Sequence, residues 1–219
     1  MIYKAVIFDL DGTLLDTIAD LGDSVNAVLK KYGFPEHDYK IYKRFVGKGV
    51  KNLMIESLPF KEIDENELNK YLTDMKDEYS KRCFNKTKPY PGITDLLDYL
   101  NNKKLNISVY SNKNDDFTKS MIKNYFPDIK FDFIIGARES KPLKPDPSIP
   151  LEISEKLGFK TEEFLYLGDS EIDMKTAKNA GMFPVAVLWG FRNKKELLEN
   201  GAKLLLENPH DLIDFLEKK

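Results

Sequence analysis

The sequence predicts an α/β protein with a parallel sheet, covered by helices on both faces, and an inserted helical domain. The chain opens with a short apolar run, Ala5 to Phe8, typical of a strand buried on both faces. The block 17–86 shows only the helical spacing of apolar residues. From residue 87 onward strand-like and helix-like stretches alternate, which indicates a parallel sheet with crossover helices.

The block after the first strand is helical throughout. In its first helix the apolar residues recur at spacings of three and four: Ile18, Leu21, Val25, Val28 and Leu29. Gly33 and Pro35 are expected to end this helix. Further helical stretches are expected at 39–45, 50–58 and 65–83. Because a crossover between strands needs only about a dozen residues, we interpret 17–86 as an inserted helical cap domain. The core domain would then be 1–16 together with 87–219.

The second half predicts the rest of the sheet. After the turn signal PYPG at 89–92, helices are expected at 93–102, 115–125, 148–157, 172–180, 194–199 and 210–216. Strands are expected at 107–110, 131–135, 164–167, 185–188 and 204–206. Asn114 is a candidate N-cap for the helix that follows it. Between the first strand and residue 107 no convincing strand is predicted.

Composition excludes several classes of partner. The chain has 219 residues, 42% hydrophobic and 32% charged, as in ordinary globular proteins. A net charge of −2, from 34 basic and 36 acidic residues, gives no strong attraction to nucleic acid or membranes. No apolar run could span a bilayer, and the first residues lack the pattern of a signal peptide. Cys83 is the one cysteine, which fits a reducing compartment. We therefore expect a cytoplasmic monomer or homodimer.

Polar residues gather where the expected strands end. They are Asp9 and Asp11 after the first strand, Ser111 and Asn112 after the second, and Asp169 and Asp173 after the fourth. Lys144 lies in a proline-rich loop, 141–147, between the third and fourth strands. Because the carboxyl ends of parallel strands lie along one edge of a sheet, these side chains are expected to meet.

This set of residues suits a phosphate-handling site. Four clustered acids need a cation, and ligands that are all oxygen suit Mg²⁺. Mg²⁺ and the Lys144 ammonium would offset three of the four negative charges, and a proton on Asp11 the fourth. One carboxylate could attack phosphorus and form an aspartyl-phosphate. A second carboxylate two residues on could protonate the leaving alkoxide and then deprotonate water.

Four motifs resemble the signatures of the haloacid dehalogenase superfamily. They are DLDGTLLD at 9–16, SN at 111–112, KPDP at 144–147 and GDSEID at 168–173. They occur in the family's order, and the resemblance covers the whole chain. With a helical insert after the first motif and a Rossmann-like core, the chain looks most like the phosphoglycolate phosphatase-type branch. The stretches FVGKG at 45–49 and SNK at 111–113 are similar to that branch.

The resemblance implies a role for each matched position. It implies that Asp9 is the nucleophile and a Mg²⁺ ligand, and that Asp11 is the general acid/base and also faces the metal through its carbonyl. It implies that Asp169 and Asp173 complete the metal site. Dehalogenases of the superfamily lack an acid at the position of Asp11, because a halide leaving group needs no proton. The resemblance therefore implies phosphate esters as substrates.

The remaining matched residues would bind the substrate. The resemblance implies that Ser111, Asn112 and Lys144 hold phosphate oxygens and that Thr13 orients Asp11 or the phosphate. Lys48, between two glycines of the cap, is a candidate for reading the substrate. Lys113 and Arg138 are further candidate contacts.

The expected function is Mg²⁺-dependent hydrolysis of a small phosphorylated metabolite, with 2-phosphoglycolate as the leading candidate. The cap would close over the site and select the leaving group. Pyrophosphate, a sugar phosphate or a nucleoside monophosphate are alternative substrates. A β-phosphoglucomutase-type transferase needs the same two acids. A phosphonate hydrolase would need a Schiff-base lysine, for which the cap offers Lys30, Lys31, Lys48 and Lys51. The non-enzyme alternative is a catalytically silent binding module, which nothing in the sequence favours.

Overall fold

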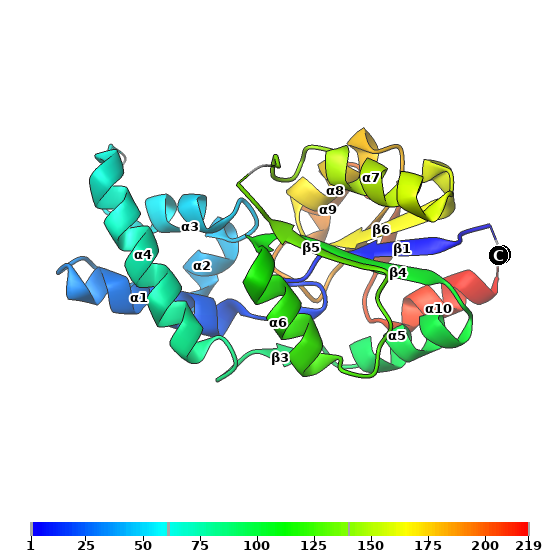
Figure 1. Ribbon diagram of the computed structural model, residues 1–219, viewed down its shortest axis with the longest axis horizontal. Helices are drawn as coiled ribbons and strands as arrows, with labels where there is room; N and C mark the ends of the chain where they lie inside the picture. The colour runs from blue at the N-terminus through cyan, green and yellow to red at the C-terminus, as the bar shows by residue number, and fades with distance from the viewer. Residues whose placement is uncertain (1, 61, 140, 219) are drawn as a thin grey trace.

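A six-stranded parallel sheet organises the described part of the chain in the computed structural model, which covers residues 2–60, 62–139 and 141–218 (Figure 1). The strand order is β5-β4-β1-β6-β7-β8. The strands are β1 (Ala5–Phe8), β4 (Asn106–Asn114), β5 (Phe133–Ala137), β6 (Phe164–Gly168), β7 (Phe183–Val187) and β8 (Leu204–Leu206). The predicted α/β class with a parallel sheet is confirmed.

The first strand lies at the centre of this sheet. In the register of β1, Ala5 is paired with Asn106 of β4 on one side and with Phe164 of β6 on the other. Val6 and Phe8 pack into one apolar cluster, whereas Ala5 and Ile7 pack into another on the opposite face. All four side chains are buried, as expected for a strand covered on both faces.

Helices cover both faces of the sheet. One face carries α5 (Ile93–Asn102), α6 (Asp115–Tyr125) and α10 (His210–Glu217). The other carries α7 (Ser148–Leu157) and α8 (Glu171–Asn179), and α9 (Lys194–Glu199) packs beside β7. A 3₁₀ turn at Thr161–Glu163 precedes β6. None of the helices in the described ranges is both long and apolar enough to cross a bilayer.

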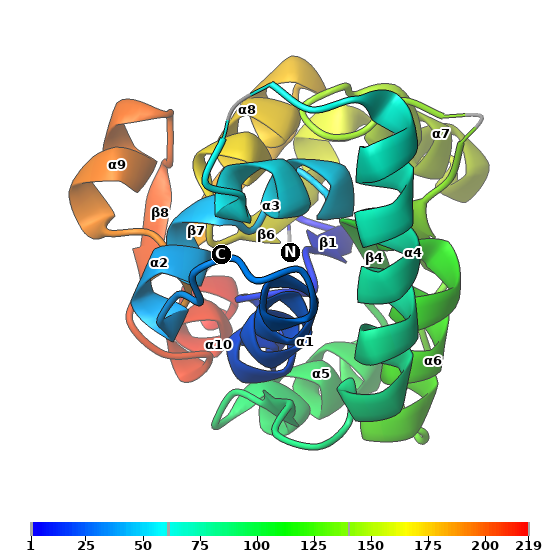
Figure 2. The same cartoon turned by 90° about the vertical axis from the view of Figure 1, so that its left-hand side faces the viewer.

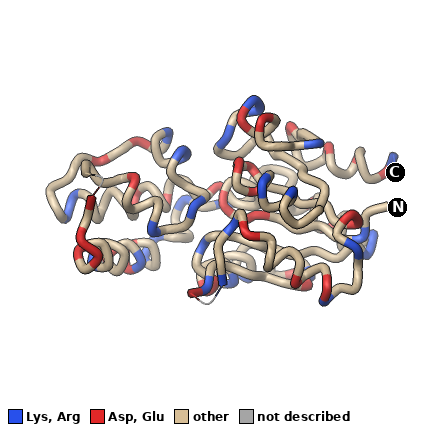
Figure 3. Tube along the Cα trace, turned by 90° about the horizontal axis from the view of Figure 1, so that it is seen from above, with Lys and Arg blue, Asp and Glu red and all other residues tan. Residues whose placement is uncertain are grey.

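Four helices form a separate group beside the carboxyl ends of the strands. They are α1 (Ile18–Lys31), α2 (Tyr39–Phe45), α3 (Val50–Ser57) and α4 (Glu65–Arg82), and we call them the helical group. Figure 2 shows the helical group in front of the ends of β1, β4 and β6. Acidic and basic residues are interspersed along both parts of the trace (Figure 3).

Two short strands connect the helical group to the sheet. They are β2 (Leu15–Asp16) and β3 (Lys88–Pro89), which pair antiparallel in a ribbon of their own. The prediction that no strand lies between the first strand and residue 107 is therefore wrong, because two-residue strands are too short to leave a periodic pattern. The buried carboxylate of Asp20 accepts the backbone N–H groups of Lys86 and Thr87, at 3.0 and 2.8 Å. The two chain crossings thus lie side by side.

Some strand bounds differ from those expected. The strand expected at 107–110 continues as β4 to Asn114, so Ser111 and Asn112 lie within a strand rather than after it. The strand expected at 131–135 is shifted to 133–137. The N-cap prediction for Asn114 is confirmed, because its side chain accepts the N–H groups of Asp116 and Phe117.

Candidate active site

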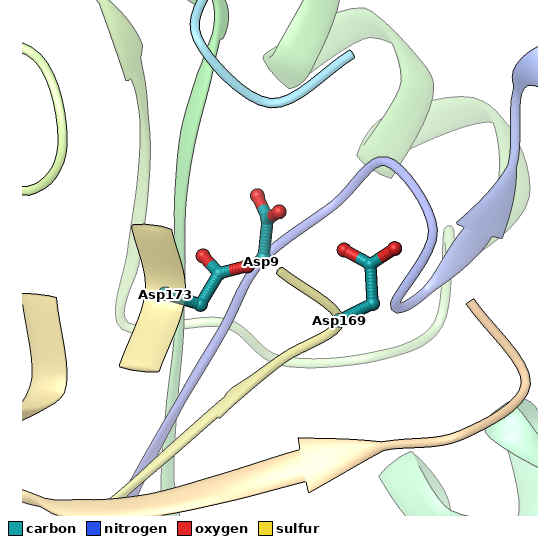
Figure 4. A group of neighbouring side chains, drawn as sticks. All are labelled: Asp9, Asp169 and Asp173. Atoms are coloured by element: carbon teal, nitrogen blue, oxygen red, sulfur yellow. The ribbon is translucent and has the colours of Figure 1, made fainter. Parts of the chain in front are cut away.

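Three buried carboxylates meet at the carboxyl edge of the sheet. Asp9 follows β1, Asp169 follows β6 and Asp173 lies in the first turn of α8 (Figure 4). Each offers an oxygen within 4.8 Å of the others. Their exposed fractions are 6%, 2% and 0%, so little bulk water screens their mutual repulsion. The fourth predicted acid, Asp11, does not belong to this group among the described residues.

Glycines allow the carboxylates to come this close. Gly12 has a φ of +82°, and a Cβ there would lie 2.2 Å from Oδ2 of Asp169. A Cβ on Gly168 would lie 2.2 Å from Cβ of Asp173. Both distances are far below van der Waals contact. The glycines of the first and fourth motifs are therefore required by the packing of the acids next to them.

A buried lysine partly balances these acids. The Nζ atom of Lys144 lies 2.8 Å from Oδ1 of Asp9 and 2.7 Å from Oδ1 of Asp173. Burial works to lower the pKa of Lys144, but the negative charges of Asp173 and Asp9 outweigh it and hold the pKa well above the ordinary lysine value. Lys144 therefore stays charged, and the proline-rich loop brings it to the position the sequence suggested.

The single charge of Lys144 does not neutralise the three carboxylates. Burial and the charge of Asp173 raise the pKa of Asp9 to about 7, although Lys144 works against the shift. Burial, with the charges of Asp173 and Asp9, also holds the pKa of Asp169 well above the ordinary aspartate value. A further cation beside these oxygens would relieve the repulsion. The three carboxylates are the described residues that could hold a metal ion.

Asp11 has its own counter-charge. The Nζ atom of Lys113 lies 3.0 and 3.3 Å from the two oxygens of Asp11. The Lys113 side chain is 5% exposed, and Nζ lies 4.4 Å from the ring centroid of Tyr79 on α4. Lys113 was expected only as a substrate contact, and the structure makes it the partner of Asp11. The separation of Asp11 from the other acids makes it chemically distinct from Asp9.

The remaining predicted residues differ in their surroundings. Ser111 is buried, and its Oγ accepts the N–H of Lys113 at 3.2 Å. Asn112 donates to the carbonyl of Gly47 at 2.9 Å and accepts the N–H of Lys144 at 2.8 Å. Both ends of its amide are therefore engaged, and Asn112 links the lysine loop to the helical group.

Thr13 and Lys48 lie in opposite environments. The Thr13 hydroxyl is buried without a hydrogen-bond partner among the described residues, while its carbonyl accepts Nε1 of Trp189. Lys48 is exposed, although Gly47 and Gly49 on either side of it line the cavity described next. Arg138 is exposed and pairs with Asp115.

A cavity of about 430 Å³, which we call the chamber, lies between the sheet edge and the helical group. The sheet side contributes mainly polar groups: Asp9, Asp11, Ser111, Asn112, Lys113, Asp169 and Ser170. The helical group contributes mainly apolar ones: Leu21, Val46, Val50, Leu53, Leu72, Met75 and Tyr79. The volume is within the range of small-molecule sites. The four candidate Schiff-base lysines are exposed, and the lysines that line the chamber are Lys76 and Lys113.

Arg192 joins the two sides of the chamber, and sequence reasoning missed it. It follows β7 and is 9% exposed. Its guanidinium donates to the carbonyls of Lys43, Arg44 and Val46 at the end of α2. It also pairs with Glu171 at 3.1 Å. Because the acceptors in the helical group are main-chain oxygens, no residue type at those positions signals the contact.

Fold and site together define a class of protein. An anion can approach crowded carboxylates only beside a cation, and here they lie at the strand ends, where α/β enzymes bind ligands. The class is therefore an α/β protein with a candidate cation site at the carboxyl ends of its strands. The chain belongs to the haloacid dehalogenase-like hydrolases, because the model of that family matches residues 6–187.

Individual proteins similar to this chain support its assignment to this family. A phosphoglycolate phosphatase from Aquifex aeolicus is 29% identical over 98% of this chain and 97% of its own length. A crystal structure from Lactobacillus delbrueckii, described as a candidate phosphoglycolate phosphatase, is 32% identical with a TM-score of 0.90, covering 99% of both chains. CbbY from Rhodobacter sphaeroides, solved with phosphate, shares the fold at 21% identity and a TM-score of 0.81, covering 96% of both chains. The chain is a phosphatase of this family.

Proposed function

We propose that this phosphatase hydrolyses small phosphomonoesters through an aspartyl-phosphate on Asp9. The observation that carries the proposal is the position of Asp9 at the base of the chamber. One of its oxygens is 2.8 Å from Lys144, and Asp169 lies beside it. A phosphoryl group there would meet a nucleophilic carboxylate and a fixed positive charge together.

The residues present fit Mg²⁺. The donor set consists of the oxygens of Asp9, Asp169 and Asp173. Burial and the charge of the neighbouring carboxylates raise the pKa of Asp9 and Asp169, as expected where three acids share one lysine. Both oxygens of Asp173 already accept hydrogen bonds, from Lys144 and Ser170, so Asp173 would be the outer ligand. When bound, the ion would neutralise charge on the transferring phosphoryl group.

Protons would be moved by Asp11. Its carboxyl lines the chamber beside Asp9, and Lys113 fixes its orientation. Asp11 would protonate the oxygen of the leaving alcohol while Asp9 forms its bond to phosphorus, and would then take a proton from the hydrolytic water. Separate surroundings for the two acids allow one to act as nucleophile and the other as acid and base.

Phosphate oxygens would be held by Lys144, Ser111 and the unpartnered Thr13 hydroxyl. Asn112 would act by positioning, since its amide is engaged by Lys144 and Gly47. We further propose that 17–86 is a cap domain that opens about the β2–β3 ribbon and closes through Arg192. Lys48 would contact the substrate only if its loop turned inward.

2-Phosphoglycolate is the first substrate to test, because the relatives from Aquifex aeolicus and Lactobacillus delbrueckii carry its name. The proposed reaction itself is tested with 4-nitrophenyl phosphate. After removal of metal with a chelator, turnover should vanish, and Mg²⁺ should restore it with release of inorganic phosphate. If Mg²⁺ restores no phosphate release from any phosphomonoester, the proposed function is wrong.

A further inference from the structure

The wall of the chamber opposite the nucleophile is apolar over most of its area. It is formed by Leu21 of α1, Leu53 of α3, and Leu72, Met75 and Tyr79 of α4, with Phe117 of α6 beside them. Leu21, Leu53, Met75 and Tyr79 are otherwise buried within the protein. Contact of this wall with an apolar group of the substrate would stabilise the complex, because apolar surface is removed from water. Contact with a charged group would not, because the charge would lose its hydration.

The buried or half-buried cations near the chamber already have partners, and the cations there without an ion pair among the described residues, Lys48 and Lys76, are exposed. Lys113 pairs with Asp11, Lys144 with Asp9 and Asp173, and Arg192 with Glu171. Lys76 lines the chamber from α4 but is exposed, as are Asn69 and Thr73 on the same helix face. On the wall formed by the helical group, the polar lining residues of α4 are therefore exposed, whereas the buried lining residues are apolar.

The chamber is also large for a two-carbon leaving group. Its volume of about 430 Å³ falls within the range of sites for whole small molecules. Glycolate is too small to cover Leu53, Leu72 and Met75 together, and its carboxylate would meet no buried cation that is without a partner among the described residues. A leaving group with a branched aliphatic or aromatic body would cover these side chains instead.

We propose that the chamber selects phosphomonoesters of primary alcohols that carry an apolar body, and that they are better substrates than 2-phosphoglycolate. The inference rests on the proposed function, since the same P–O bond breaks, phosphorus passes to Asp9, and the alcohol oxygen takes its proton from Asp11. The helical group then contributes specificity through apolar contact.

The test compares esters whose leaving alcohols have similar intrinsic reactivity. The wild-type enzyme with Mg²⁺ is given ethyl, 3-methylbutyl and 2-phenylethyl phosphate, and 2-phosphoglycolate. We expect kcat/KM to be about 10- to 100-fold higher for the two bulky esters than for 2-phosphoglycolate, from burial of one apolar group. Leu72→Gln should reduce that ratio about tenfold.

Two lysine variants test the rival explanation, in which Lys76 binds the carboxylate of 2-phosphoglycolate. Lys76→Met removes the exposed cation of the chamber, and Lys70→Met is its matched control on the same helix, outside the lining. If 2-phosphoglycolate is the best substrate, and Lys76→Met lowers its kcat/KM while Lys70→Met does not, the chamber reads a carboxylate and the inference is overturned.

Binding distinguishes failure of this inference from failure of the proposed function. Calorimetric titration with methylphosphonate and 3-methylbutylphosphonate, in Mg²⁺, needs no turnover. We expect about 10- to 100-fold tighter binding of the larger phosphonate, with a more negative heat-capacity change. Equal affinities would overturn the inference even if phosphatase activity is present, and tighter binding would support it even if hydrolysis is absent.

Discussion

The two walls of the chamber are built on opposite principles. On the sheet side, the charged groups Asp9, Asp11, Lys113, Lys144 and Asp173 are buried or half-buried and tied to one another. On the side of the helical group, the cavity is lined mainly by apolar side chains, which form no ion pairs. Under the proposed function, the first wall would carry out the reaction and the second would select the leaving group.

The two walls should also respond differently to substitution. Removing one partner of a buried ion pair leaves the other charge unpaired, which costs about 3–5 kcal/mol. Gly12 and Gly168 have no space for a Cβ, so the backbone beside the acids is equally constrained. Leu72, which lines the cavity and is only partly buried, should lose mainly its own contact area when it is changed. Substitutions on the sheet side should therefore change the rate, and those in the helical group the choice of substrate.

The largest effect is expected from Asp9→Asn. An amide cannot attack phosphorus, so kcat should fall about 10⁴-fold or more for every ester tested. The measurement is steady-state phosphate release. The matched control is Asp128→Asn, the same change at an exposed position. A rate near that of the wild type would exclude Asp9 as the nucleophile, and a loss confined to bulky esters would contradict the division between the two walls.

Asp11→Asn should show which step needs the proton. For alkyl phosphates kcat should fall about 10²- to 10⁴-fold, because an alkoxide leaves poorly without protonation. With 4-nitrophenyl phosphate the first turnover should survive, because nitrophenolate needs no proton, while attack by water slows. Stopped-flow kinetics should then show a burst of nitrophenolate close to the enzyme concentration. Equal losses for both ester types in the first turnover would contradict the role of Asp11.

Metal binding should stabilise the fold in a pH-dependent way. The folded-state pKa of Asp9, about 7, is raised above the ordinary aspartate value. Between about pH 4 and pH 7 the unfolded chain therefore loses a proton that the folded chain keeps, and the metal-free protein loses stability as pH rises. Mg²⁺ at 100 times its Kd contributes about 2.7 kcal/mol, or roughly 5–10 °C in Tm.

Calorimetry should show a larger Tm gain from Mg²⁺ at about pH 8 than at about pH 5, since protons compete for the same oxygens. Asp169→Asn should remove most of that gain, whereas Leu72→Gln, on the other wall, should keep it. A gain independent of pH would mean that the ion binds elsewhere.

The smallest effect is expected at the junction of the walls. Arg192→Met removes the donor to three carbonyls of the helical group, so the closed arrangement should be less populated. KM should rise about tenfold with a smaller change in kcat. Solution scattering should show a larger radius of gyration. Arg138→Met, at an exposed arginine, is the control, and an unchanged KM for Arg192→Met would exclude the closing role.

Local patterns predicted the sheet side well. The apolar run of β1, the acids after it and the alternation of the second half are visible in sequence because each depends on neighbouring residues. The partnership of Lys113 with Asp11 is not, because it joins residues 102 positions apart and depends on side-chain direction within β4. The motif predicted that Asn112 binds phosphate. In the structure its amide contacts the carbonyl of Gly47 and the N–H of Lys144.

The junction of the two walls was the least predictable part. β2 and β3 are stabilised by their pairing with each other, and neither leaves a periodic pattern in the sequence. Asp20 and Arg192 act on main-chain groups, which every sequence contains, so their partners leave no signature. Sequence patterns report which face of an element is buried, but they do not report which backbone atoms a distant side chain reaches.

The contact of Arg192 with main-chain oxygens affects which substitutions the helical group can tolerate. A carbonyl is present whatever residue occupies positions 43, 44 or 46, so mutation there leaves the hydrogen-bond acceptors in place. Related proteins could therefore accumulate new side chains at these positions while the hydrogen bonds to Arg192 are kept. The side chains that face the substrate could then change without loss of the contact that Arg192 makes between the two parts.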